Sequence, residues 1–108
     1  MRTLLVSGLL LLAWAAPAQA ATCKAPEYPG EGYFTSLTAT KVSCSTASRF
    51  VVKYYKCRTK TGPTGRCVKR VDGYSCTETR HSIPTEINGK VTCKKGSRRI
   101  VHTYQQNT

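Results

Sequence analysis

The sequence predicts an α+β domain in which one helix packs on a three- to four-stranded antiparallel sheet, in the chain order β-α-β-β-β, with disulfides stabilising the fold. Three observations lead to this prediction. Residues 44–58 carry apolar side chains at helical spacing, several other segments are rich in β-branched and aromatic residues, and the short chain contains six cysteines. A single helix among several strands is typical of a sheet that is covered on one face.

The first twenty residues are predicted to form a signal peptide. Arg2 provides a positive charge, residues 4–16 form an apolar run, and residues 18–20 (Ala-Gln-Ala) have the small-x-small pattern of a cleavage site. The apolar run is too short to span a bilayer comfortably and no second one follows, so no transmembrane segment is expected after cleavage. Thr22 stands before Cys23, where a lipid-anchored bacterial protein would have a small residue. We expect a protein that is secreted or resides in the periplasmic or cell-wall space.

The mature chain is expected to contain one domain. Residues 21–32 include two prolines and two glycines and are predicted to form an extended N-terminal arm. Residues 33–108 are predicted to be a single disulfide-bonded α+β domain, because a chain of this length supports one modest core.

The cysteines indicate three disulfides, since an even number in a short exported chain is typical of a disulfide framework. Each bond stabilises the fold by about 2–4 kcal/mol. Cys57 and Cys67 flank a loop with Gly and Pro and are predicted to pair; the other four allow three pairings, among which we favour Cys44 with Cys76 or Cys93. No two cysteines have the C-x-x-C spacing that zinc sites prefer, so no metal and no cofactor is expected. The six are Cys23, Cys44, Cys57, Cys67, Cys76 and Cys93.

The helix predicted at residues 44–58 has two different faces. Ser43 is a suitable N-cap, because its hydroxyl can accept a hydrogen bond from a free backbone N–H. Lys56 and Arg58 near the other end suit the helix dipole. The stripe expected to be buried consists of Ala47, Phe50, Val51 and Tyr54, and the opposite, solvated face carries Arg49, Lys53 and Lys56.

Strands are predicted at residues 33–42, at 68–79 with a bulge at Gly73, and in a hairpin of residues 90–95 and 98–105; a break at 59–66 and a polar connection at 81–88 separate them. Gly96-Ser97 is a suitable two-residue hairpin turn, which would place Cys93 opposite Ile100. The hairpin face expected to join the core carries Val91, Cys93, Ile100, His102 and Tyr104.

Four short motifs lie between Ser43 and Tyr104. They are Ser43-Cys44 with Ala47-Ser48-Arg49, Gly73-Tyr74-Ser75-Cys76, Val91-Thr92-Cys93-Lys94-Lys95-Gly96, and Arg99-Ile100-Val101-His102-Thr103-Tyr104. Together they resemble a loose group of small exported, cysteine-containing proteins, mostly actinobacterial, to which we know of no assigned function. The resemblance implies export and this type of fold but assigns no site.

Charge suggests what the protein binds. Without Arg2, sixteen Lys or Arg residues stand against five acids, a net charge of +11. The sequence therefore predicts a non-enzymatic domain whose partner is an anionic cell-envelope or extracellular polymer. Specific nucleic-acid binding is not predicted, because basic residues do not alternate with exposed aromatic ones. The leading candidate site is the hairpin tip with Lys94, Lys95, Arg98 and Arg99, and the second is the helix patch of Arg49, Lys53 and Lys56.

Two alternatives from other classes remain open. Residues 59–63 (Thr-Lys-Thr-Gly-Pro) are similar to the reactive segment of Bowman–Birk-type serine-protease inhibitors, a resemblance that implies a specificity residue at Lys60. The third hypothesis is a small secreted ribonuclease, in which His81, His102 and a lysine would supply general acid–base groups. A structural role for both histidines is the simpler interpretation.

Overall fold

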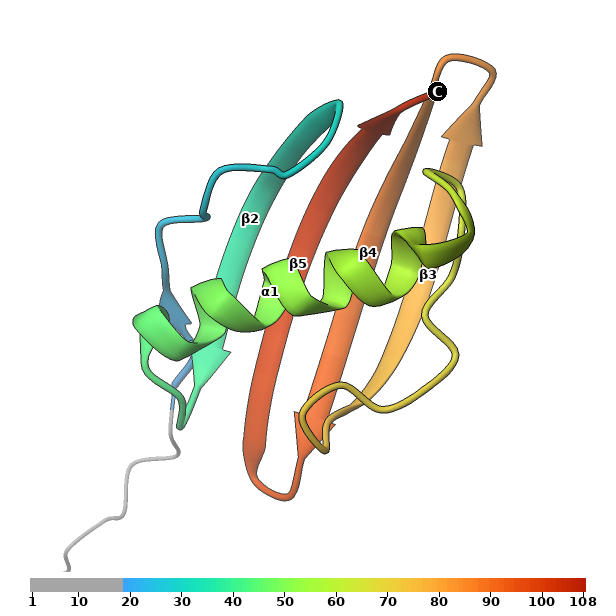
Figure 1. The fold of residues 1–108 in the computed structure, drawn as a ribbon. Coiled ribbons are helices and arrows are strands. Elements are labelled where there is room, and N and C mark those ends of the chain that lie inside the picture. The colour runs from blue at the N-terminus through green and yellow to red at the C-terminus, as the bar shows by residue number, and fades with distance from the viewer. Residues whose placement is uncertain (1–18) are drawn as a thin grey trace, which may run out of the picture.

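A computed structural model describes residues 19–108; most of the predicted signal peptide, residues 1–18, lies outside the described residues. One antiparallel sheet has the strand order β1-β2-β5-β4-β3, and the helix lies across one of its faces (Figure 1). The α+β class and the chain order of the four long strands are confirmed, and a two-residue strand in the N-terminal arm adds a fifth. The elements are β1 (Ala21–Thr22), β2 (Gly32–Thr40), α1 (Cys44–Arg58), the 3-10 helix η1 (Thr59–Thr61), β3 (Ser75–Ile83), β4 (Glu86–Lys95) and β5 (Arg98–Asn107).

Helix α1 begins where the sequence predicts and buries the predicted stripe. The Ser43 hydroxyl accepts a hydrogen bond from the Thr46 backbone N–H at 3.1 Å, which confirms the N-cap. Arg58 is the exception, because it is buried instead of lying at a solvated helix end. The buried helix residues are Ala47, Phe50, Val51, Tyr54 and Arg58.

The β4–β5 hairpin has the predicted register, with Cys93 opposite Ile100 and Val91 opposite His102. Gly96 takes a positive φ of 58° in the turn, a conformation that glycine adopts without strain. Side chains alternate between two faces along each strand. The helix-covered face holds the predicted core residues, and the face away from the helix, here called the open face, carries polar side chains.

Two predicted segments differ from the structure. Residues 81–88 are not a connection: β3 continues to Ile83, and Pro84-Thr85 forms a tight turn into β4. The polar composition of residues 81–88 favoured a connection in the prediction. An edge strand with one open face needs few apolar residues, so this composition is also compatible with a strand. Residues 68–74 precede β3 and end in a turn at Asp72 and Gly73, which have φ angles of 49° and 79°.

The three disulfides are Cys23–Cys44, Cys57–Cys67 and Cys76–Cys93. The Cys57–Cys67 prediction is confirmed, and the pairing favoured for Cys44 is wrong. Cys76 and Cys93 are directly opposite each other on β3 and β4, whereas Cys44 opens the helix and holds the N-terminal arm. Three disulfides indicate an oxidising, extracytoplasmic compartment. Among residues 19–108, no helix has the length and apolar character needed to cross a membrane.

Candidate functional site

A groove with a volume of about 320 Å³ lies between helix α1 and the segment of residues 69–72. Five basic side chains line it, and Asp72 is its only acid. The Lys53 ammonium binds the Asp72 carboxylate at 2.8 Å, so the acid is already paired. We call this hollow the basic groove; its basic residues are Lys53, Lys56, Lys60, Lys69 and Arg70.

Covalent and packing contacts hold the two walls of the basic groove together. The Cys57–Cys67 disulfide ties the loop to the end of the helix just before Lys69. Further along, the Tyr74 ring packs 4.7 Å from the Phe50 ring, between centroids. Val71 and Tyr74 form an isolated antiparallel β-bridge, and its two backbone hydrogen bonds close the turn at Asp72 and Gly73. The cations of the groove are therefore carried on a fixed backbone.

Lys69 and Arg70 were not predicted as site residues, because the sequence pattern placed both in a regular strand. The signal available was their position directly after Cys67. A disulfide ring that closes on the helix end must bring the residues following Cys67 back to the helix, next to Lys56 and Lys60.

The predicted hairpin-tip site is divided between the two faces of the sheet. Lys94 and Arg99 are directly opposite each other and belong to the open face. Lys95 turns to the helix side, where its ammonium donates to the Asp72 carbonyl at 3.1 Å and lies 5.7 Å from the Tyr74 ring centre. Arg98 borders a separate hollow beside the start of α1. The four cations form no single cluster.

The predicted helix patch is also divided. Lys53 and Lys56 both line the basic groove. Arg49 instead points back along the helix, where its guanidinium donates to the Ser45 hydroxyl at 3.0 Å.

A buried polar network lies between the helix and the sheet. Glu78 accepts hydrogen bonds from the Tyr54 hydroxyl at 2.9 Å, from the Tyr104 hydroxyl at 3.1 Å, and from Arg80. Burial, followed by the nearby Glu78 charge, raises the pKa of Tyr54, and burial raises the pKa of Tyr104. Both tyrosines are therefore neutral donors at ordinary pH. The network is satisfied internally, which favours a structural role.

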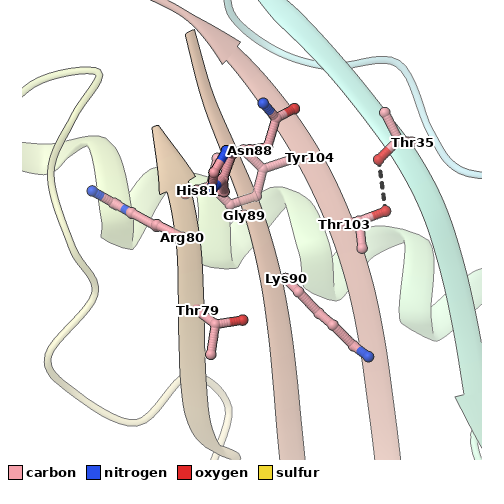
Figure 2. A pocket seen from close by; sticks show the side chains of 9 residues that line it. All are labelled: Thr35, Thr79, Arg80, His81, Asn88, Gly89, Lys90, Thr103 and Tyr104. Atoms are coloured by element: carbon pink, nitrogen blue, oxygen red, sulfur yellow. Dashed lines mark hydrogen bonds between the residues drawn. The ribbon is translucent and has the colours of Figure 1, made fainter. Parts of the chain in front are cut away.

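The two histidines lie on opposite faces of the sheet. His81 is exposed on the open face, in a hollow of about 330 Å³ (Figure 2). His102 is 1% exposed beneath the helix, and burial, followed by the nearby Arg58 charge, lowers its pKa to about 3. The structure does not bring them together as an acid–base pair.

The segment that resembles a protease-inhibitor loop has a helical backbone. Thr59–Thr61 form η1, and the Gly62 N–H bonds back to the Thr59 carbonyl at 2.9 Å. A segment that binds in a protease cleft like a substrate must have an extended backbone. The helical backbone of Thr59–Thr61 therefore does not present Lys60 to a protease as a substrate-like residue.

No family model, curated protein or solved structure matches this chain. The suspected kinship to small exported proteins therefore stays a prediction. Within residues 19–108, no group of three His, Cys, Asp or Glu side chains is placed to hold a metal ion.

Proposed function

We propose that this protein is a non-enzymatic domain that binds an anionic cell-envelope or extracellular polymer in the basic groove. The observation that supports the proposal is the gathering of five cations from two separate segments around one hollow with a single, already paired acid.

Electrostatics favours a polymer with repeated negative charge. Like charges crowded around one hollow repel each other, and a polyanion relieves this repulsion at several positions at once. Arg70 can bind a phosphate, sulfate or carboxylate group through two parallel hydrogen bonds, while the lysines act as point charges. Because these cations are exposed, salt screens the attraction, and the affinity should fall steeply as ionic strength rises.

The disulfide ring contributes rigidity. Lys60 lies on the helix side of the Cys57–Cys67 bond and Lys69 lies on the loop side. Their backbones are held in place before the polymer arrives, so less conformational entropy is lost on binding.

The test is the affinity for inorganic polyphosphate, measured by titration calorimetry at low and moderate salt. A triple variant, Lys56→Gln, Lys60→Gln and Arg70→Gln, should bind about tenfold more weakly, since each exposed ion pair contributes about 0.5 kcal/mol. The matched control removes three exposed charges that lie outside both the basic groove and the hairpin tip, through Lys24→Gln, Lys41→Gln and Arg49→Gln, and should lose much less. Equal losses would mean that net charge alone governs binding.

The hairpin tip remains the second candidate for the same polymer. Removing Lys95 and Arg98 together, and separately Lys94 and Arg99, tests it under the same conditions. Removing Lys95 and Arg98 should weaken polyphosphate binding more than removing Lys94 and Arg99, because Lys95 contacts Asp72 beside the basic groove.

A further inference from the structure

The open face of the sheet carries a second hollow, far from the basic groove in the fold. Figure 2 views this face with the helix behind the sheet. The hollow has a volume of about 330 Å³ and crosses four strands, from Thr35 on β2 to Thr79 on β3. No described element covers it. Its open-face lining residues are Thr35, Thr79, His81, Asn88, Lys90 and Thr103.

The strand register arranges polar side chains of the open face in two neighbouring rows across the sheet. Residues directly opposite each other in an antiparallel sheet point to the same face. One row therefore consists of His81, Asn88, Gln105 and Tyr33, and the next consists of Thr79, Lys90, Thr103 and Ser36. Four adjacent strands span about 14 Å from the first to the last, which is enough for a short length of a linear polymer.

A cluster of three hydroxyls is already ordered at one side of this hollow. The Thr103 hydroxyl is 2.6 Å from the Thr35 hydroxyl and 2.5 Å from the Ser36 hydroxyl. Threonine has few χ1 rotamers, and its backbone here is held in a sheet. Little further entropy is lost when such hydroxyls bind a ligand.

Tyr33 adds an apolar surface at the end of the first row. Its side chain is 64% exposed, although it is one of the largest on this face. A tyrosine presents an apolar ring and a polar tip, which suits the flat C–H face and the hydroxyl edge of a sugar ring.

The charge of the open face favours an acidic ligand. Lys90, Lys94 and Arg99 belong to this face, and Glu86 is its only acid in the described residues. Lys90 lies within the hollow, between Thr79 and Thr103.

From these observations we infer that the open face binds a chain of an acidic polysaccharide that runs across the strands, with its hydroxyls bonded to the two polar rows and an acidic substituent at Lys90. This site is separate from the basic groove, and its exposed Tyr33 ring can pack on a sugar face, which polyphosphate lacks. Its existence does not depend on the function proposed for the groove.

The experiment compares two anionic probes, a hexamer of galacturonate and inorganic polyphosphate, by calorimetry and by backbone amide chemical shifts. The variant is the double substitution Tyr33→Ala and Asn88→Ala, which changes exposed neutral side chains and leaves the net charge unaltered. We expect the double substitution to weaken galacturonate binding about tenfold, because it removes the contacts of Tyr33 and Asn88 with the sugar chain. Polyphosphate binding should stay unchanged. In the native protein, galacturonate should shift the amides of Asn88, Lys90 and Thr103.

A matched control, Thr64→Ala with Val68→Ala, changes exposed neutral side chains of the loop and should affect neither probe. Absence of galacturonate binding, equal weakening for both probes, or shifts confined to the basic groove would overturn the inference. It would also be overturned if a single-stranded oligothymidine displaced galacturonate at lower concentration, or if sedimentation showed a dimer that buries the open face. Polyphosphate binding of the groove triple variant is measured separately, so failure of either site is distinguished from failure of the other.

Discussion

The Arg58 guanidinium lies 4.3 Å from the centre of the Tyr104 ring, in the interior between helix and sheet. It donates to the Pro63 carbonyl and to the Tyr28 hydroxyl, both at 2.7 Å, and to the Gln106 side-chain oxygen at 3.3 Å. No carboxylate in residues 19–108 forms a salt bridge with it. A buried cation is thus held by three hydrogen bonds to neutral oxygens and by an aromatic ring, and these contacts offset part of the high cost of burying its charge.

This arrangement predicts that Arg58→Lys is more harmful than Arg58→Met. Lysine keeps the buried charge but cannot reproduce the planar fork of donors, so we expect a loss of about 2–4 kcal/mol in the free energy of unfolding. Methionine removes the charge, and the Tyr28 hydroxyl still donates to Gln106, so the loss should be about 1–2 kcal/mol. Urea unfolding measures both, with exposed Lys56→Met as control. The reverse order would show that the charge itself is stabilising.

Stability should fall as pH drops from about 6.5 towards 3, because His102 is neutral in the folded protein. Its folded pKa is about 3 and its ordinary value is 6.5, so the unfolded chain binds the proton first between these values. The contribution of neutral His102 to the free energy of unfolding is present in full above pH 6.5. Its loss reaches about 4–5 kcal/mol when the pH falls to about 3.

His102→Phe isolates this effect, since a phenyl ring can pack against Phe34 and Tyr54 as the imidazole does. Thermal unfolding at several pH values should show a flatter profile for this variant than for the native protein. Exposed His81→Gln serves as control and should keep the native profile. Parallel profiles for all three proteins would contradict the assignment.

The Cys23–Cys44 disulfide should hold the N-terminal arm against the domain. Replacing both cysteines by serine should make the backbone at Lys24 more susceptible to limited proteolysis. It should also increase amide exchange in β1, because that strand has only two residues. The affinity of the basic groove for polyphosphate should not change. Mass spectrometry of non-reduced peptides checks the pairing itself, and a free Cys44 thiol would contradict it.

Trypsin should cleave this protein only slowly after Lys60 and should not be inhibited by it. Lys60 is exposed and lies in a 3-10 helix, so its segment must unwind before it can fit an extended protease cleft. Titration of trypsin, followed by the residual peptidase activity and the cleavage products, tests this. Tight inhibition that disappears in Lys60→Ala would instead support the inhibitor resemblance.

Patterns that depend on neighbours in the chain were predictable from the sequence. The N-cap at Ser43, the buried stripe of α1 and the register of the β4–β5 hairpin all follow from residues a few positions apart. Cys57–Cys67 belongs with them, since a short Gly- and Pro-containing loop separates the two cysteines.

Features that depend on distant segments were not predictable. Nothing local marks Arg58 as buried, because its partners Tyr28 and Gln106 come from the two ends of the domain. The basic groove likewise needs the loop to fold back on the helix, and the polar composition of β3 hides a strand whose outer face has no core to cover.

The order of the disulfides has a consequence for how the native protein is made. Each cysteine pairs with the next one along the chain, first with second, third with fourth and fifth with sixth. A polypeptide that enters an oxidising space with its N-terminus leading then presents every thiol to its correct partner before the following pair arrives. Oxidation in order of arrival yields the native bonds directly, and thiol–disulfide exchange is needed only to repair errors.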